Sequence, residues 1–213
     1  MLELRHSALL VIDMQRDFCA PGGYADRAGL DVGRLRAPIP ALQRLLAGAR
    51  ARGMTVVHTR EGHRPDLSDL PEPKRRRAAA SGAPIGSPGP LGRLLVRGEY
   101  GHDFIDELRP LAGEPVIDKP GYSAFAHTDL ELLLRNRGIG QLFLAGVTTE
   151  VCVSSTLRQA IDLGFACFTL ADACASHDPR LHQAALDMIH VEGGLFGGVI
   201  DSAELLDRLE SAA

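Results

Sequence analysis

Short apolar runs alternate along the chain with longer segments whose apolar residues recur at helical spacing. The runs have the length and the branched residues typical of β-strands, and they lie at 8–12, 54–58, 115–118, 142–147, 165–170 and 197–200. The segments with helical spacing lie at 35–52, 130–137, 151–163, 179–191 and 203–209. Because the runs are continuously apolar rather than alternating, they predict strands whose two faces are both covered.

Strict alternation of strands and helices predicts βαβ units and a parallel sheet. We therefore expect an α/β fold with three layers, a doubly wound sheet of about six parallel strands between helices. The length of 213 residues suits a single domain over 1–213. Ligands of such sheets bind beyond the carboxyl ends of the strands, near the point where the strand order reverses.

One stretch, residues 60–101, interrupts the alternation and is rich in Pro, Gly and Arg. It is longer than an ordinary connection, which predicts a long loop insertion that acts as a functional flap, an interface loop or a mobile segment. The basic run Lys74–Arg77 lies within it. This run could contact an anion, but a solvated face or a contact with a partner subunit is the more ordinary role of such a run.

Composition excludes several classes of protein. The formal net charge is −4, so no global basic field is available to hold nucleic acid or an anionic membrane. No apolar run has the length of a membrane-spanning helix, and the first residues do not read as a signal peptide. The four cysteines lack the spacing of a metal finger. We expect a reduced, cytoplasmic globular protein.

Three reactive side chains stand where predicted strands end or the next helix begins, namely Asp13, Lys119 and Cys152. A cysteine in the first turn of a helix feels the positive end of the helix dipole, which favours the thiolate, and a nearby ammonium favours it further. Asp13 could remove the thiol proton. Taken singly, each residue has an ordinary alternative role: Asp13 as an N-cap, Lys119 as a solvated charge and Cys152 as a small core residue.

The order of three motifs makes the catalytic interpretation more specific. They are Leu10–Phe18, Ile117–Pro120 with Ser123–Phe125 behind it, and Leu144–Val153. In this order they resemble the isochorismatase-like cysteine hydrolases over essentially the whole chain. The resemblance implies an Asp–Lys–Cys triad of Asp13, Lys119 and Cys152, on a six-stranded parallel sheet between helices.

The resemblance also implies a cis peptide bond between Val147 and Thr148. The backbone N–H groups of Thr148 and Cys152 would then form an oxyanion hole. Relatives of this kind assemble as dimers or tetramers, so a homo-oligomer is implied, and neither a cofactor nor a metal is expected.

Further motifs are similar to those of triuret and biuret hydrolases and, more loosely, of ureidoacrylate amidohydrolases. They are Thr59–His63 with Pro65–Asp69, Gly98–Asp103, and Met188–His190 before Gly193 and Gly194. Biuret hydrolases carry a substrate-binding glutamine forty residues after the nucleophile, where this chain has Glu192. A carboxylate only accepts hydrogen bonds, and triuret offers additional N–H donors. Glu192 therefore favours triuret, although it could equally be a surface or capping carboxylate.

Aromatic residues near the triad are candidates for shaping a pocket for a small, flat, polar substrate. Phe18 follows Asp13 by five residues, and Tyr122 and Phe125 follow Lys119. Phe18 could equally be a core residue that shields the sheet edge. At the start of the 60–101 segment, Arg60 and Glu61, with His63, are weaker substrate-binding candidates.

Nicotinamidases, which belong to the superfamily that this chain resembles, bind a divalent metal through an aspartate and two histidines. Here His58, His63 and Asp66 fall in the corresponding region but lack the Asp-x-His spacing, so we expect no metal. The predicted activity is triuret hydrolysis, which releases ammonia and gives carboxybiuret and then biuret. Biuret or ureidoacrylate hydrolysis is the alternative. Two more distant alternatives remain. The chain could hydrolyse nicotinamide, or it could be a non-catalytic scaffold that binds a partner through its basic loop.

Overall fold

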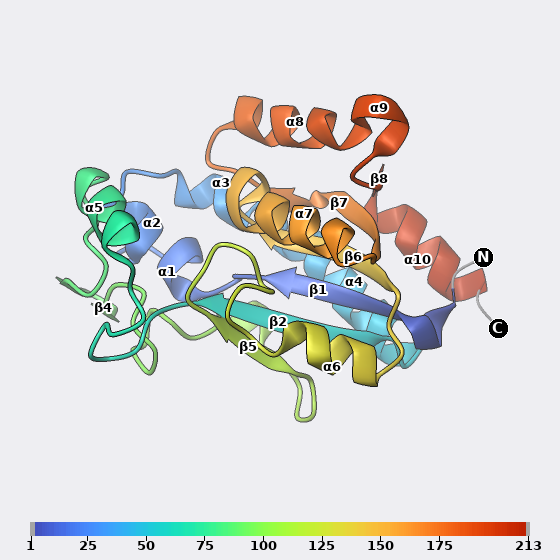
Figure 1. Ribbon diagram of the computed structural model, residues 1–213, viewed down its shortest axis with the longest axis horizontal. Coiled ribbons are helices and arrows are strands. Elements are labelled where there is room, and N and C mark those ends of the chain that lie inside the picture. Colours follow the sequence, from blue (N-terminus) through green and yellow to red (C-terminus); the bar gives the residue numbers. More distant parts are fainter. Residues whose placement is uncertain (1–2, 212–213) are drawn as a thin grey trace.

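The computed structural model describes residues 3–211 and is built on one six-stranded sheet in which every adjacent pair of strands is parallel (Figure 1). In spatial order the strands are β5 (Val116–Lys119), β2 (Thr55–Glu61), β1 (Ser7–Ile12), β6 (Gln141–Val147), β7 (Ala166–Ala175) and β8 (Gly198–Ile200). The chain starts near the middle and builds outward in both directions. This confirms the predicted α/β, doubly wound fold, and the strand order reverses between β1 and β6.

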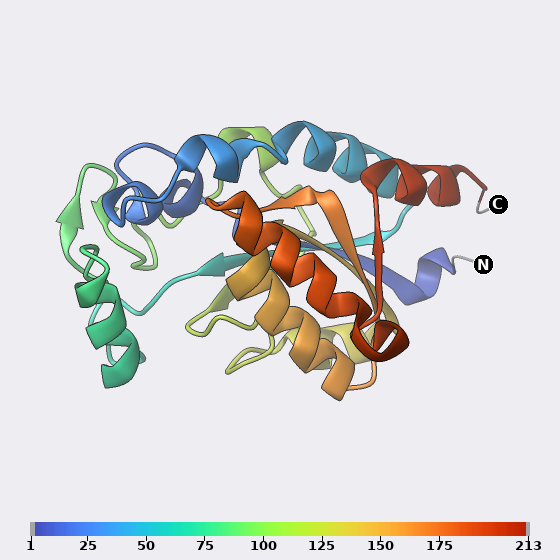
Figure 2. The same ribbon diagram turned by 90° about the horizontal axis from the view of Figure 1, so that it is seen from above.

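Helices cover both faces of the sheet, as Figure 2 shows from above. One layer holds α3 (Val32–Arg36), α4 (Ile39–Ala51) and α10 (Ser202–Ser211), and the other holds α6 (Leu130–Asn136), α7 (Ser154–Asp162) and α8 (Pro179–Asp187). Alternation along the central strand supplies both cores: Leu9 and Val11 face the first layer, whereas Leu10 and Ile12 face the second. Burial on both faces explains the unbroken apolar pattern of β1.

Proline and glycine move some element ends away from their predicted positions. The predicted helix 35–52 is two helices, because Pro38 and Pro40 prevent continuous hydrogen bonding between α3 and α4. A π-helical turn, η3 (Thr149–Val153), precedes α7. The helix predicted over 179–191 ends at Asp187 and continues as η4 (Met188–His190) and α9 (Val191–Gly194), where Glu192 and Gly193 have positive φ. A single 3₁₀ turn, η1 (Leu4–His6), precedes β1.

The carboxyl ends of the strands lie beneath a cap of short elements. The cap contains α1 (Arg16–Cys19), α2 (Tyr24–Arg27), α5 (Glu72–Ala80), the hairpin of β3 (Pro88–Gly89) and β4 (Gly92–Arg93), and η2 (Asp106–Leu108). The 60–101 segment thus has structure of its own, since β2 runs on to Glu61 and α5 follows. Asp17 joins this segment to α1 by accepting a hydrogen bond from Leu95 N at 2.9 Å.

Within residues 3–211, no helix combines the length and the apolar character that crossing a bilayer requires.

Candidate active site

Four chemically active side chains meet at the carboxyl edge of the sheet. Asp13 directly follows β1, Glu61 and Lys119 end β2 and β5, and Cys152 lies in η3 after β6. Because these strands are parallel, all four ends open at the same edge, and β1 and β6 flank the point where the strand order reverses. One ligand atom each from Asp13, Glu61 and Cys152 lies within 4.8 Å of the others.

Lys119 is the centre of this cluster and is fully buried. Its Nζ lies 2.7 Å from Asp13 Oδ2, 3.4 Å from Glu61 Oε2 and 3.4 Å from Cys152 Sγ. Burial alone would lower the pKa of Lys119, but Asp13, Cys152 and Glu61 raise it above its ordinary value. Lys119 is therefore a permanent ammonium, whose task is to stabilise negative charge on its neighbours.

Asp13 is held in a backbone conformation that is uncommon for a residue with a side chain, with φ +54°. Thr59 fixes its carboxylate, because Thr59 Oγ1 donates to Asp13 Oδ1 at 2.6 Å. Burial raises the pKa of Asp13 above its ordinary value, although Lys119 opposes this. The result is a carboxylate with a greater affinity for a proton than an ordinary aspartate has.

Glu61 lies in a different electrostatic environment only one strand away. Lys74 on α5 places its Nζ 2.6 Å from Glu61 Oε1, and both side chains are almost fully buried. Burial would raise the pKa of Glu61, but Lys119 and Lys74 together hold it at about 2. Gln15 clamps the backbone of this residue, donating to Glu61 O at 3.0 Å and accepting from Glu61 N at 2.7 Å. Glu61 is thus a fixed anion with little affinity for a proton.

Cys152 lies at the start of a helical run, in η3 just before α7. Its Sγ lies 3.2 Å from Glu61 Oε2. Burial raises the pKa of Cys152 well above its ordinary value, against the influence of Lys119. The resting group is therefore a thiol surrounded by two carboxylates and one ammonium.

The other three cysteines, Cys19, Cys167 and Cys174, are buried away from the cavity that Cys152 lines, and burial raises the pKa of each to about 12. They have neither the access nor the neighbouring ammonium that Cys152 has.

The chain between β6 and Cys152 contains the cis peptide bond Val147–Thr148 that the resemblance implies. One residue earlier, Gly146 has φ +115°, and a Cβ there would collide with the carbonyl oxygen of Ile12. Glycine at this position therefore allows β6 to approach the end of β1 closely. This approach brings Cys152 next to Asp13.

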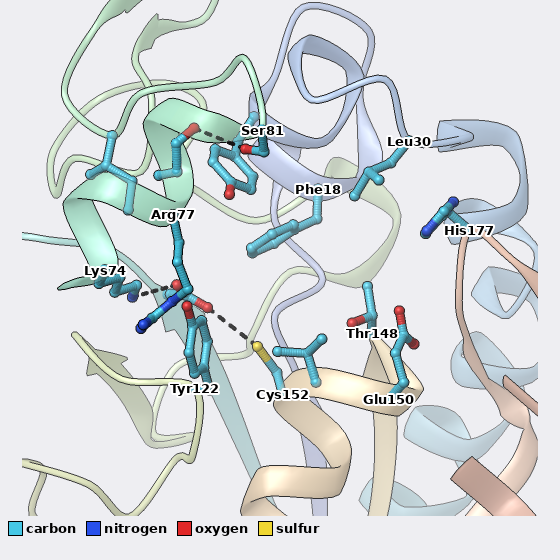
Figure 3. A pocket seen from close by; sticks show the side chains of 15 residues that line it. Phe18, Leu30, Lys74, Arg77, Ser81, Tyr122, Thr148, Glu150, Cys152 and His177 are labelled. Carbon is cyan, nitrogen blue, oxygen red and sulfur yellow. Dashed lines mark hydrogen bonds and ion pairs between the residues drawn. The ribbon is translucent and has the colours of Figure 1, made fainter. Parts of the chain in front are cut away.

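A cavity of about 300 Å³ opens above Cys152 (Figure 3). Lys74, Arg77 and Tyr122 border it on one side, and Thr148, Glu150 and His177 border it on the other. Glu61, the partner of Lys74, also belongs to its lining. The remaining lining residues, mostly apolar or aromatic, are Phe18, Tyr24, Leu30, Ala78, Ser81, Ile85 and Val151. The cavity is the size of a small organic molecule and exposes one nucleophile on its floor.

The structure places two of the predicted substrate-binding aromatic residues, Phe18 and Tyr122, in the cavity lining, together with Glu61. The prediction for Phe125 is corrected: its ring is buried in the core of the second helix layer, where it stacks on Phe165 at 5.7 Å. Phe125 follows Tyr122 by three residues in an irregular loop, and at that point the chain has turned from the cavity into the core.

Two charged candidates also lie away from the cavity. Arg60 points to the opposite face of β2 from Glu61, as the alternation of a strand requires, and its guanidinium binds Asp118 at 2.8 Å. Glu192 is exposed in α9 and is not part of the cavity lining of its own chain. The argument that favoured triuret through Glu192 therefore lacks structural support.

The three residues considered for a metal are engaged separately. His58 Nε2 lies 3.0 Å from Glu114 Oε2, His63 Nδ1 lies 3.2 Å from Asp69 Oδ1, and Asp66 is exposed. Within residues 3–211, only Asp13, Glu61 and Cys152 group closely enough to ligate an ion. The ammonium of Lys119 already lies among these three groups and offsets part of the charge of the two carboxylates.

Several residues that surround the cavity were not identified from the sequence. Lys74, Arg77 and Ala78 line it from α5, and Ser81 lines it from the C-cap of that helix; together they follow the i, i+3, i+4, i+7 spacing of one helical face. That spacing is the signal that could have revealed them. The expectation of a solvated face does not hold for Lys74, which is buried, whereas Arg75, Arg76 and Arg77 are exposed and Arg77 points into the cavity; a contact of this run with a partner subunit stays a prediction.

Comparison with known proteins agrees with this geometry. The family model of the isochorismatase domain matches residues 7–204. The ureidoacrylate amidohydrolase RutB of Serratia proteamaculans (strain 568) is 37% identical over 201 residues, which are 92% of this chain and 80% of that protein. A cysteine hydrolase from Pseudomonas syringae pv. phaseolicola 1448A superposes with a TM-score of 0.85 at 28% identity, over 100% of this chain and 96% of that one. N-carbamoylsarcosine amidase from Thermoplasma acidophilum superposes with a TM-score of 0.70 at 27% identity, over 92% and 96%.

Proposed function

The chain belongs to the isochorismatase family, as a cysteine hydrolase of amide C–N bonds, and we propose that it cleaves a small carbamoylated acid of the ureidoacrylate type. The observation that carries this proposal is the position of Cys152 Sγ, on the floor of a small cavity and within reach of Asp13, Glu61 and Lys119.

In the proposed reaction, Asp13 rather than Glu61 receives the thiol proton. Both carboxylates are close to Cys152, but burial raises the pKa of Asp13, whereas two ammonium groups hold that of Glu61 at about 2. Two carboxyl groups whose environments separate their proton affinities divide the acid–base work between them. Asp13 acts as the base, and Glu61 remains ionised.

The thiolate formed on Cys152 attacks the carbamoyl carbon. Lys119 supports the negative charge on sulfur at the moment of proton transfer. The N–H groups of Thr148 and Cys152 are proposed to bind the oxygen on which negative charge develops. Asp13 then returns its proton to the leaving nitrogen, and an acyl group remains on sulfur. Water, activated by Asp13, cleaves this thioester and restores the thiol.

Both the relatives and the cavity support an acid as substrate. Two of the similar proteins, the ureidoacrylate amidohydrolase and the N-carbamoylsarcosine amidase, are named for compounds that carry both a carbamoyl group and a carboxylate. The cavity adds Arg77 on one of its sides, a cation that can attract an anionic substrate, whereas Lys74 beside it is already paired with Glu61. Triuret and biuret are uncharged, so they offer Arg77 carbonyl oxygens but no opposite charge.

The test is ammonia release from a panel of ureidoacrylate, triuret, biuret, nicotinamide and an N-carbamoyl amino acid. We expect ureidoacrylate or the N-carbamoyl acid to have the highest kcat/KM. Substitution Cys152→Ser should abolish turnover while binding persists. A wild-type enzyme that prefers triuret, biuret or nicotinamide would contradict the proposal, and so would a C152S variant that retains full turnover.

A further inference from the structure

Two charged side chains line the cavity on opposite sides of Cys152 and have no protein partner. Arg77 reaches in from α5, and Glu150 borders the other side from η3 (Figure 3). Among residues 3–211, neither side chain forms an ion pair, and the Oε2 atom of Glu150 is buried without a hydrogen bond. Lys74, by contrast, is fully engaged by Glu61 and by the carbonyl oxygen of Pro120 at 2.6 Å.

The chemistry of these two groups is complementary. A guanidinium is donor-only, and its planar fork matches the two oxygens of a carboxylate. An ionised Glu150 can only accept hydrogen bonds, so it needs N–H or O–H donors from whatever fills the cavity. Leaving a buried acceptor unsatisfied is costly, which favours a ligand that donates at this end.

We propose that Arg77 and Glu150 fix the orientation of the substrate, with its carboxylate on Arg77 and the free NH₂ of its carbamoyl group donating to Glu150. This inference rests on the proposed function and adds two specificity-determining residues to it. It also decides which of the two C–N bonds of the ureide breaks.

Lys74 borders the cavity on the same side as Arg77 and pairs with Glu61, and Lys119 joins Glu61 to Asp13, the base of the proposed reaction. In the proposed orientation the substituted nitrogen faces this side. When the S–C bond forms, the bond from carbon to that nitrogen breaks, and Asp13 transfers to it the proton taken from the thiol. The carbamoyl group remains on Cys152, and one water releases it as carbamic acid, which decomposes to ammonia and carbon dioxide.

The first test separates recognition of charge from general damage. Steady-state kinetics would compare ureidoacrylate with the corresponding carboxamide, which has the same shape without the charge. Arg77→Met should lower kcat/KM for ureidoacrylate by about 10- to 100-fold, the effect of losing a charge-assisted hydrogen bond, and leave the carboxamide nearly unaffected. Arg76→Met is the matched control, because Arg76 lies on the same helix, is 79% exposed and does not line the cavity. Equal losses for both substrates in R77M would overturn the proposal.

The second test concerns Glu150. Wild-type enzyme should discriminate against ureidoacrylate that carries a methyl group on its terminal nitrogen. Glu150→Ala should lower kcat/KM for ureidoacrylate about tenfold and reduce that discrimination, because space and a lost acceptor then favour the methyl group. Glu131→Gln, which changes a charge on the solvent side of α6, should change neither value. Unchanged discrimination in E150A would contradict a contact between Glu150 and this nitrogen.

The composition of the acyl-enzyme decides between the two C–N bonds. Acid quenching during turnover of ureidoacrylate, followed by mass spectrometry, should find a bare carbamoyl group on Cys152. An adduct that retains the acrylate portion would show that ammonia leaves first and would overturn the orientation while the proposed function stands. A wild-type enzyme that hydrolyses no ureide would overturn both.

Discussion

Asp13 and Glu61 present two carboxylates to one thiol, and their surroundings give them opposite proton affinities. Asp13 faces one ammonium and is fully buried, whereas Glu61 is held between Lys119 and Lys74. A division of roles therefore follows from environment rather than from residue type, since a single additional lysine on α5 makes the difference.

This division predicts the acid limb of the pH–rate profile. Asp13 must be ionised to accept the thiol proton, and its pKa is raised above the ordinary value of 3.8 by burial. As the pH falls, kcat/KM should therefore decline through a pH above 3.8. Asp13→Asn should lower kcat by about 10²- to 10⁴-fold. An acid limb at or below pH 3.8, or a D13N variant close to wild type, would exclude Asp13 as the base.

The sequence identifies Asp13, Lys119 and Cys152 because each follows a recognisable apolar strand, so the topology alone brings them to one edge. For Glu61 the sequence signal is weak, because the apolar pattern of its strand ends at residue 58, whereas β2 continues to Glu61. Its importance depends on Lys74, thirteen residues later. Such a pairing between a strand and a distant helix depends on tertiary packing and leaves no local pattern.

At the scale of elements, α5 is anchored over the cavity by one buried ion pair. Lys74 and Glu61 expose only 7% and 4% of their side chains. Because both groups are buried, removing Lys74 takes away one of the two ammonium groups that compensate Glu61, and removing Glu61 leaves the Lys74 ammonium without its carboxylate. The same pair holds the helix that presents Arg77, so stability and substrate recognition are coupled at this element.

Lys74→Met should accordingly reduce the free energy of unfolding by about 3 kcal/mol. Urea denaturation would measure this, with Arg75→Met, an exposed residue of the same helix, as the control. The double variant with Glu61→Gln should be less destabilised than the sum of the two single variants, because both charges are then absent. If the losses of the two single variants simply added, the interaction energy between Lys74 and Glu61 would be zero and the prediction would be wrong.

The edge between β2 and β5 carries a second testable feature, His58. Burial lowers its pKa to about 4, although Glu114 opposes the shift. The folded state therefore keeps His58 neutral, whereas the unfolded chain protonates it below about pH 6.5. Since the unfolded state binds the proton more readily, stability should fall as the pH drops from 6.5 towards 4.

Unfolding measured at pH 7 and at pH 4.5 tests this. Wild type should lose about 2 kcal/mol more than His58→Gln over that interval. If both proteins lost stability equally, His58 would not be the group that titrates.

At the scale of the whole molecule, helices cover both faces of the parallel sheet, and the reactive side chains gather at its carboxyl edge. The continuously apolar strands predicted this architecture correctly. The cap over the strand ends was less predictable, since its elements are short and depend on single contacts such as Asp17 with Leu95. Outside the cap, α8, η4, α9 and the residue that follows α9 expose large apolar side chains, namely Leu181, Met188, Val191 and Leu195. Exposed apolar side chains on consecutive elements are typical of an association surface.

The predicted homo-oligomer can be tested on this surface. Light scattering should give a dimer or tetramer of the 22.8 kDa chain. The double substitution Met188→Asp and Leu195→Asp, which places two charges on the surface, should lower the molar mass. A monomeric wild type would contradict the prediction. A variant with unchanged mass would place the interface elsewhere.

The central claim is that Cys152 is the nucleophile and carries the acyl group during turnover. Its most direct test is peptide mapping of enzyme quenched with acid during steady-state hydrolysis of ureidoacrylate. We predict a substrate-derived adduct on the peptide that contains Cys152, with none on Cys19, Cys167 or Cys174, and its loss when turnover is complete. Undiminished turnover by Cys152→Ala, or an adduct on a different residue during turnover, would contradict the account.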